Sequence, residues 1–240
     1  MRLGLATGLP AAAADRLAPC LEGMSGPRAL LHEAARTGLV LNFTGGRDRH
    51  AVRGRVYDTI ADLPGAVLGA AAPRLTPQGL RVDGPEDTIS LTDLPALGFD
   101  PLQPFTLMVE WNLPALTGLQ AALTIDDGTT SNRWPQIWAH NAGNAQVFTS
   151  SSVGPLQGVL SSTVLQGRSR LAVSLRANSI SGSINGGSII VDPEIDRPVG
   201  LANMRLGARA SDGYLNGSLA AIAIWTAPLD EGRLEFIAGH

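Results

Sequence analysis

The segment from residue 126 to residue 144 contains the densest group of side chains able to hold a sugar. Two tryptophans in it, Trp134 and Trp138, are flanked by carboxylates, amides, an arginine and a histidine. Flat aromatic faces stack on sugar rings, and amides and carboxylates hydrogen-bond to hydroxyls. We therefore predict a ligand-binding loop formed by Asn132, Arg133, Trp134, Trp138, His140, Asn141 and Asn144. The alternative is that the tryptophans belong to the core and the small polar residues only form a turn.

A second polar and aromatic loop contains Arg209, Asp212 and Tyr214, which we add to the predicted ligand-binding residues. A solvated hairpin turn is the competing interpretation. Asp126 and Asp127 are candidate Ca²⁺ ligands, but two adjacent carboxylates do not supply the roughly six to eight oxygen ligands that Ca²⁺ takes. We expect no metal and no cofactor.

Three carboxylates, Asp192, Glu194 and Asp196, are the residues whose spacing suggests glycosidic bond cleavage. That chemistry needs an acid and a nucleophile or base at a fixed separation. Pro193 and Pro198 indicate a loop rather than a central strand, which would not hold the pair rigidly. Nucleophilic catalysis is not indicated either, because no nucleophile-elbow motif accompanies any of the four histidines, His32, His50, His140 and His240. We therefore expect a protein that is not an enzyme.

Charge and cysteine content exclude several classes of protein. All 18 basic residues are arginine, and with 21 acidic residues the net charge is −3, so no electrostatic footprint for nucleic acid or anionic lipid is present. Arginines at positions 47, 49, 53 and 55 alternate on what reads as one strand face. These arginines suit binding to an acidic polysaccharide or to an acidic subunit surface. The alternative is a solvated edge strand whose charges protect it from pairing. The single cysteine, Cys20, excludes an intrachain disulfide, and no apolar run is long enough for membrane insertion.

The hydrophobic period changes near residue 37. Before it, Leu30, Leu31, Ala34 and Ala35 have helical spacing and Gly38 is a natural stop, so we predict a small helical arm over residues 1–37. After it, short runs of β-branched and aromatic residues are separated by turn residues, as in an all-β sandwich. No convincing helix lies between residues 38 and 228, which excludes α/β folds with helical crossovers.

Residues 105–111 form the clearest strand. Phe105, Leu107, Val109 and Trp111 fall on one face, which we expect to be buried, and Thr106 and Glu110 fall on a face that we expect to be mostly wet. Residues 219–225 are apolar at almost every position, which predicts a central strand buried on both faces. Asn185-Gly186 is a strong hairpin signal between residues 179–184 and 188–191.

Several motifs in order resemble a known family. The turn Asp83-Gly84 within residues 79–91, the Asn185-Gly186 hairpin, the strand at residues 204–207 and the segment 214–225 are similar to the concanavalin A-like, laminin-G-like jelly roll. The resemblance spans residues 38–240 and implies an antiparallel two-sheet β-sandwich.

The start, Met1-Arg2-Leu3-Gly4-Leu5, ahead of such a domain resembles tail, fibre and spike proteins of bacteriophages or gene transfer particles. This resemblance implies a virion surface protein whose arm docks on other particle proteins and whose sandwich binds host-surface polysaccharide. Several weak sugar sites gain avidity in an oligomer, so we expect a homo-oligomer. Deletion of residues 1–37 should then leave a folded monomer that is not incorporated. The alternatives are a structural particle component without a ligand and a polysaccharide-cleaving glycosidase.

Overall fold

A computed structural model describes residues 11–71, 74–129, 132–139, 144–151, 154–163, 166–195, 198–209 and 213–239. For residues 11–15, 134, 138–139, 144–146, 148–151 and 154–163 it describes the backbone alone. None of the helices in these ranges is long and apolar enough to cross a membrane.

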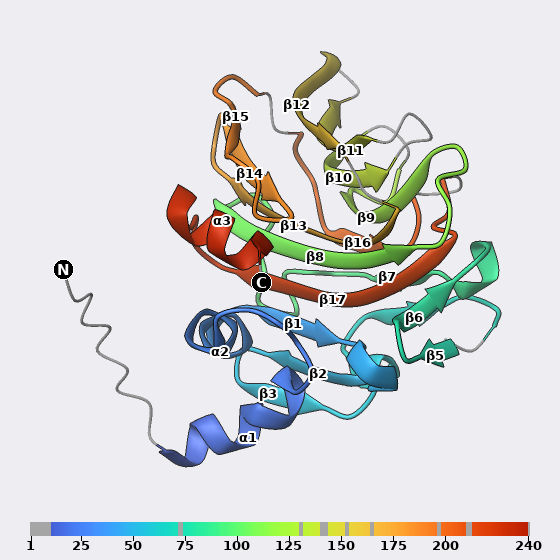
Figure 1. The fold of residues 1–240 in the computed structure, drawn as a ribbon, viewed down its shortest axis with the longest axis vertical. Helices are drawn as coiled ribbons and strands as arrows, with labels where there is room; N and C mark the ends of the chain where they lie inside the picture. Colours follow the sequence, from blue (N-terminus) through green and yellow to red (C-terminus); the bar gives the residue numbers. More distant parts are fainter. Residues whose placement is uncertain are drawn as a thin grey trace.

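Two antiparallel sheets face each other in the described part of the chain (Figure 1). The larger sheet has the order β15-β14-β13-β8-β17-β1-β2-β3, with β6 pairing to β17 and β5 to β6. Its strands are β1 (Leu39–Asn42), β2 (Arg49–Val52), β3 (Arg55–Tyr57), β5 (Arg74–Thr76), β6 (Gly79–Val82), β8 (Phe105–Leu113), β13 (Gly167–Leu175), β14 (Ile180–Ile184), β15 (Ile190–Asp192) and β17 (Gly217–Trp225).

The smaller sheet has the order β12-β11-β10-β9-β16-β7-β4. Its strands are β4 (Ala66–Leu68), β7 (Ile89–Leu91), β9 (Gln120–Asp126), β10 (Arg133–Ala139), β11 (Asn144–Ser151), β12 (Gly154–Thr163) and β16 (Asn203–Leu206). The helices are α1 (Ala11–Leu21), α2 (Arg28–Thr37) and α3 (Glu231–Gly239), with short 3₁₀ turns η1 (Thr44–Gly46), η2 (Ile60–Asp62) and η3 (Pro85–Asp87). The predicted all-β sandwich is confirmed.

The main core lies between the two sheets. Leu107, Val109 and Trp111 of β8 pack in one cluster with Leu123 and Ile125 of β9, all buried. The side-chain alternation read from the sequence of β8 therefore gives the correct inner face. The hairpin signal is also confirmed, because Asn185 and Gly186 both have positive φ, at 51° and 72°.

A second core covers the other face of the larger sheet. In Figure 1 the helices α1, α2 and α3 lie on this side, and Leu21, Leu31 and Ile237 from them pack in one buried cluster with Ala223 and Trp225 of β17. Leu219, Ile222 and Ile224 of β17 enter the core between the sheets. The prediction that residues 219–225 are buried on both faces is confirmed.

The expectation that Thr106 and Glu110 lie on a mostly wet face is wrong. Their exposed fractions are 0% and 1%. The hydroxyl of Thr106 donates to the carbonyl oxygen of Ala227 at 3.0 Å, and the Trp225 indole N–H donates to the carbonyl oxygen of Leu30 at 2.8 Å. Strand alternation identifies two faces, but it does not say that helices from both ends of the chain cover the second one.

Gly38 allows the end of α2 to lie close to the backbone of β17. Its N–H donates to the carbonyl oxygen of Ala34 at 2.8 Å, which closes the helix. A Cβ at this position would lie 1.9 Å from the carbonyl oxygen of Ile224, so only glycine allows this approach. Residues 11–37 thus lie against the sandwich by way of α1 and α2.

Candidate functional site

The backbone pairing divides the sequence-predicted ligand residues between the two ends of β9 and β10. Asn132 and Arg133 lie where Arg133 pairs with Asp126, at the end of β9. Asn144 begins β11 at the other end, where Ala139 pairs with Gln120. The strand between these ends spans roughly 20 Å at the usual rise per residue. One small ligand cannot contact both groups.

Tyr214 and Arg209, both half-buried, lie at the Gln120 end of β9, because Ala121 N–H donates to the carbonyl oxygen of Gly213 at 2.7 Å. Trp134 and Trp138 belong to β10 by their backbone, but their side chains are not described. His140, Asn141 and Asp212 lie outside the described residues. Binding by this set of residues stays a prediction.

Asp126 and Asp127 are engaged by protein groups. Asp126 is fully buried, bonds the Arg205 guanidinium at 2.5 Å and accepts the Gly128 N–H at 2.8 Å. Burial acts to raise the pKa of Asp127, but hydrogen bonds from Thr129 and Asn132 outweigh it and hold that pKa below its usual value. Both carboxylates therefore act here in fixing the turn after β9.

A different acidic group, Asp83, Glu86 and Asp87, brings its ligand atoms within 4.8 Å of one another. The hydrogen bond between the two aspartate carboxyls lowers the pKa of Asp83 and raises that of Asp87. Arg74 bonds Asp83 at 2.5 Å, so a guanidinium supplies the positive charge at this turn. Hydrogen bonds and a salt bridge within the chain account for the group.

The carboxylates at 192 and 194 lie at the end of a strand. β15 ends at Asp192, and Glu194, which is exposed, follows in a loop where its N–H donates to the Asp192 carboxylate at 3.2 Å. Pro193 therefore predicts this loop correctly. Asp196 lies outside the described residues.

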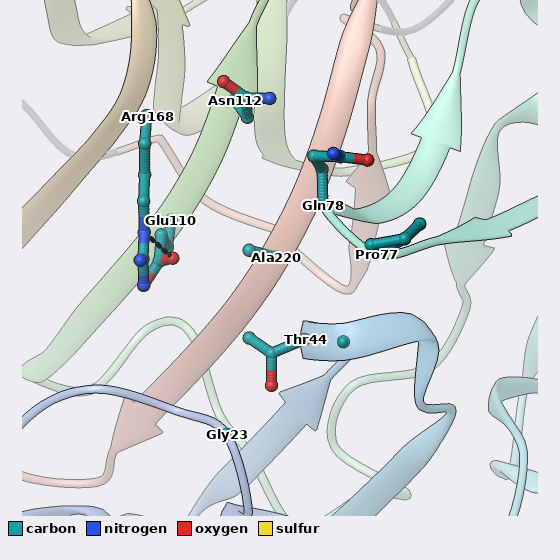
Figure 2. A pocket seen from close by; sticks show the side chains of 9 residues that line it. Gly23, Thr44, Pro77, Gln78, Glu110, Asn112, Arg168 and Ala220 are labelled. Atoms are coloured by element: carbon teal, nitrogen blue, oxygen red, sulfur yellow. Dashed lines mark hydrogen bonds and ion pairs between the residues drawn. The ribbon is translucent and has the colours of Figure 1, made fainter.

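A pocket of about 340 Å³ opens on the helix-covered face of the larger sheet, beside the part that the helices cover (Figure 2). We call it the sheet pocket. Strands β8, β13 and β17 contribute its floor, and the segment after α1, η1 and the β5–β6 turn contribute its walls. It is lined by Gly23, Thr44, Gly45, Pro77, Gln78, Glu110, Asn112, Arg168 and Ala220. The sequence indicated Glu110 and Ala220 only as strand residues, and it predicted none of the lining residues to bind a ligand.

Small residues and a strand irregularity make room for the sheet pocket. The pairing of β17 with β8 shifts register between Leu219 and Ala221, which places the small side chain of Ala220 at the floor. Gly23 has φ +79°, and a Cβ there would lie 2.8 Å from the Thr44 hydroxyl oxygen. A larger residue at position 23 would be strained and would push into the wall of the pocket.

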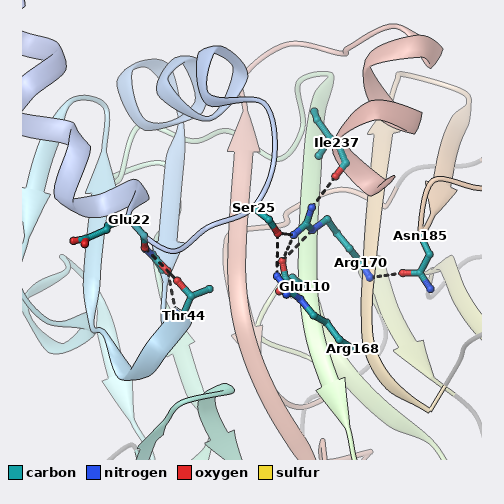
Figure 3. A network of polar contacts seen from close by, with 9 residues as sticks. Glu22, Ser25, Thr44, Glu110, Arg168, Arg170, Asn185 and Ile237 are labelled. Atoms are coloured by element: carbon teal, nitrogen blue, oxygen red, sulfur yellow. Dashed lines mark hydrogen bonds and ion pairs between the residues drawn. The ribbon is translucent and has the colours of Figure 1, made fainter. Parts of the chain in front are cut away.

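A network of charged groups forms one side of the sheet pocket (Figure 3). Glu110 is 1% exposed and bonds Arg168 through Nε at 2.5 Å and Arg170 through Nε at 3.0 Å. Arg170 also donates to the Ser25 hydroxyl and to the carbonyl oxygen of Ile237. A buried carboxylate requires such compensation, because taking an unpaired charge out of water is costly. The network joins β8 and β13 to α3 and to the segment between α1 and α2.

The two arginines in this network have different surroundings. The side chain of Arg170 is 6% exposed, whereas that of Arg168 is 58% exposed. The Nε of Arg168 bonds Glu110 and its Nη2 donates to the Ser25 hydroxyl at 2.9 Å. Nη1 of Arg168 has no hydrogen-bond partner among the described residues, so it is available to a ligand at the mouth of the pocket.

The remaining lining groups suit hydroxyl recognition. Neither side-chain amide, that of Asn112 nor that of Gln78, has a hydrogen-bond partner within the described ranges, and each offers a donor and an acceptor. Figure 2 shows Glu110, Arg168 and Asn112 on one side of Ala220 and Gln78 on the other. Glu110 is the one carboxylate among the described residues that line the pocket, and two arginines bond it.

Cys20 is buried away from both the sheet pocket and solvent. Its side chain is 0% exposed, its thiol lies 3.1 Å from the carbonyl oxygen of His50, and burial raises its pKa to about 11. The His50 ring bonds Asp48 at 2.5 Å, so its contact with Cys20 is through the backbone. A thiol in this state is a poor nucleophile.

We expect Cys20 to resist alkylation by iodoacetamide at mildly alkaline pH, because the reactive thiolate forms rarely when the thiol pKa is about 11. Mass spectrometry of the native protein should show no adduct over hours, and the same protein in denaturant should be labelled completely. Rapid labelling of the native protein, at the rate of the denatured one, would show that the thiol is accessible.

No protein-family model matches the chain, and no curated protein matches it in sequence. Similarity appears in solved structures. The CBM40 of a Ruminococcus gnavus IT-sialidase matches with a TM-score of 0.50 and 16% identity, over 57% of this chain and 84% of that chain. Its complex with α2,3-sialyllactose matches with a TM-score of 0.51 and 17% identity.

A Trypanosoma rangeli sialidase in complex with the inhibitor DANA matches with a TM-score of 0.59 and 10% identity, over 82% of this chain. The match covers 32% of that sialidase chain, so this protein corresponds to about a third of it. Together these likenesses show a two-sheet, lectin-like β-sandwich fold.

Proposed function

We propose that the protein is a non-catalytic glycan-binding β-sandwich whose sheet pocket holds one sugar unit of a host-surface polysaccharide. The observation that supports this most directly is the pocket lining, where the amides of Gln78 and Asn112 and the guanidinium of Arg168 surround the small side chain of Ala220. Hydroxyl groups pair with amides in both directions, and a sugar carboxylate pairs with the guanidinium.

The charge arrangement favours an acidic sugar over a neutral one. Arg168 lines the pocket with a side chain that is 58% exposed, while the carboxylate of Glu110 is already bonded to two guanidinium groups. A ligand carboxylate therefore meets a guanidinium group at the mouth of the pocket, and the adjacent hydroxyls reach the amides. A solved structure with the same fold, the CBM40 complex, contains α2,3-sialyllactose, which makes this trisaccharide the first probe to use.

The residues that line the sheet pocket also support a non-catalytic role. Glycosidic hydrolysis requires two carboxyl groups about 5 to 10 Å apart across the bond. Glu110 is the one carboxylate in the described lining, and Arg168 and Arg170 hold it in ion pairs. A carboxylate in that environment is a structural counter-ion and a recognition group rather than an acid catalyst.

We further propose that the protein is displayed on a phage or gene transfer particle, as a homo-oligomer that contacts other particle proteins through residues 1–37. Its support is the resemblance of residues 1–5, ahead of a jelly-roll domain, to tail and spike proteins. Repeated copies on one particle convert weak sugar binding into avidity. Immunogold labelling of particles with an antibody against this chain is the test; labelled particles are expected, and particles free of the chain would refute it.

We expect the double substitution Gln78→Ala and Asn112→Ala to weaken glycan binding about tenfold or more, because it removes two amides at roughly 1 kcal/mol each. Isothermal titration calorimetry with α2,3-sialyllactose and with capsular polysaccharide measures the change. The matched control is Gln103→Ala, which removes an exposed amide outside the sheet pocket. If the double variant binds as the wild type does while the fold is intact, the sheet pocket is not the site.

A further inference from the structure

A second pocket of about 400 Å³ lies at the opposite end of β2 from the sheet pocket. We call it the edge pocket, because β3 is the last strand of the larger sheet. It is lined by Val52, Arg53, Arg55, Tyr57, Pro64, Ala96, Leu97 and Gly98. No residue of this set lines the sheet pocket, so the two cavities are separate.

Arg53 occupies a backbone conformation that arginine rarely adopts. Among the described residues, three non-glycine positions have positive φ: Asp93, Asn185 and Arg53, the last at +46°. Aspartate and asparagine tolerate this region, whereas arginine does not. Arg53-Gly54 forms the two-residue turn between β2 and β3, a position that asparagine or glycine would fill without strain. A residue kept under backbone strain is a reasonable indicator of a functional role.

The exposed side chain of Arg53 passes over a bare stretch of backbone at Gly98. Gly98 has φ +75°, and a Cβ there would lie 2.4 Å from both Cδ and Nη1 of Arg53. The glycine therefore leaves room for the arginine side chain to pass over it.

Arg55 and Tyr57 complete the polar lining. They are two residues apart on β3 and so point to the same side of the sheet, where Tyr57 packs against the core between the sheets. In the part of the chain that the structure describes, neither Arg53 nor Arg55 forms an ion pair or a hydrogen bond through its side chain. The described residues that line the pocket include no acidic one, although the whole chain has a net charge of −3.

We propose that the edge pocket binds an oxyanion, the carboxylate or sulfate group of a small ligand, between the guanidinium groups of Arg53 and Arg55. Guanidinium groups recognise such planar or tetrahedral anions through paired N–H donors. Tyr57 contributes a further hydroxyl, and Val52, Pro64 and Leu97 supply an apolar wall for the body of the ligand. This site is independent of the sheet pocket and of the function proposed for it.

The decisive variant is Arg53→Asn, since it removes the guanidinium and at the same time relieves the strained turn. It should melt at a higher temperature than the wild type and yet bind sodium glucuronate at least tenfold more weakly. Arg55→Gln, on an exposed side chain, should also weaken binding. Arg16→Gln, an exposed arginine on α1 outside both pockets, is the matched control and should bind as the wild type does.

Calorimetric titrations with sodium glucuronate, sodium sulfate and glucose separate the sources of the anion. The site is supported if either anion binds saturably to the wild type, if Arg53→Asn loses this binding and if glucose does not bind. Competition between the two anions would show that the protein recognises the oxyanion group. No saturable binding by the wild type, or equal binding by Arg53→Asn, would overturn the proposal and leave the two arginines as charges that protect an edge strand from pairing. Because glucuronate also suits the sheet pocket, the titrations are repeated in the Arg168→Gln background, where Arg53→Asn should still remove saturable binding.

Discussion

Replacing Glu110 by glutamine is expected to lower the free energy of unfolding by about 3 kcal/mol, because it leaves the buried guanidinium of Arg170 without its counter-charge. The side chains of Glu110 and Arg170 are 1% and 6% exposed, so water does not screen the loss. Urea denaturation followed by tryptophan fluorescence measures the change. The control Glu235→Gln, on the exposed side of α3, should stay within about 0.5 kcal/mol of the wild type.

A double substitution distinguishes the loss of charge balance from a loss of packing. Glu110→Leu combined with Arg170→Met replaces the pair by apolar side chains of similar size, and such replacements are often neutral. The double variant should therefore recover much of the stability that Glu110→Gln loses. Wild-type stability for Glu110→Gln would contradict the importance of this network for joining β8 and β13 to the helices.

Deletion of residues 1–37 is expected to prevent folding. The deletion removes Leu21, Leu31, Ala34 and Ala35, all 0% exposed, and uncovers the face of the larger sheet that contains Trp225. Each leucine alone contributes about 1.5 to 3 kcal/mol by burial, and a domain has only about 5 to 15 kcal/mol of net stability. The sequence alone leads to the opposite expectation, a folded monomer without its arm.

Circular dichroism and gel filtration test this deletion. The truncated chain should be aggregated or lack a cooperative thermal transition, whereas deletion of residues 1–10, which removes none of these buried side chains, should preserve the transition. A monomeric, cooperatively folded chain without residues 1–37 would contradict the expectation and favour a detachable arm.

The alternation of Phe105, Leu107, Val109 and Trp111 was enough to predict a strand and its inner face, because side chains of a strand alternate with period two. Asn185-Gly186 was enough to predict a hairpin. What alternation could not predict is the burial of Glu110, since the cover over that face comes from helices distant in sequence. The apolar stripe of α2, with Leu30 and Leu31, was the available signal, as such a stripe requires a partner surface.

The sheet pocket was beyond prediction for a different reason. Its lining comes from single residues far apart in the chain, such as Gly23, Gln78 and Arg168, which no motif connects. One signal was present: a glutamate in an otherwise apolar strand requires a buried cation, and Arg168 and Arg170 stand on a strand of matching alternation. The 126–144 segment was predicted as the site because its aromatic and amide residues are close in sequence, but strand pairing separates Asn132 and Arg133 from Asn144 at the two ends of β9.

A nuclear magnetic resonance titration of the isotope-labelled wild-type protein with α2,3-sialyllactose, followed by capsular polysaccharide fragments, tests glycan binding most directly. We expect saturable shifts of the amide signals of Thr44, Gln78, Asn112 and Arg168, with no shortening of the sugar. Saturable shifts confined to residues 132–144, or at 209–214, would place the glycan on the loops instead. No shifts with any glycan, or release of shorter sugars, would contradict a non-catalytic glycan-binding function.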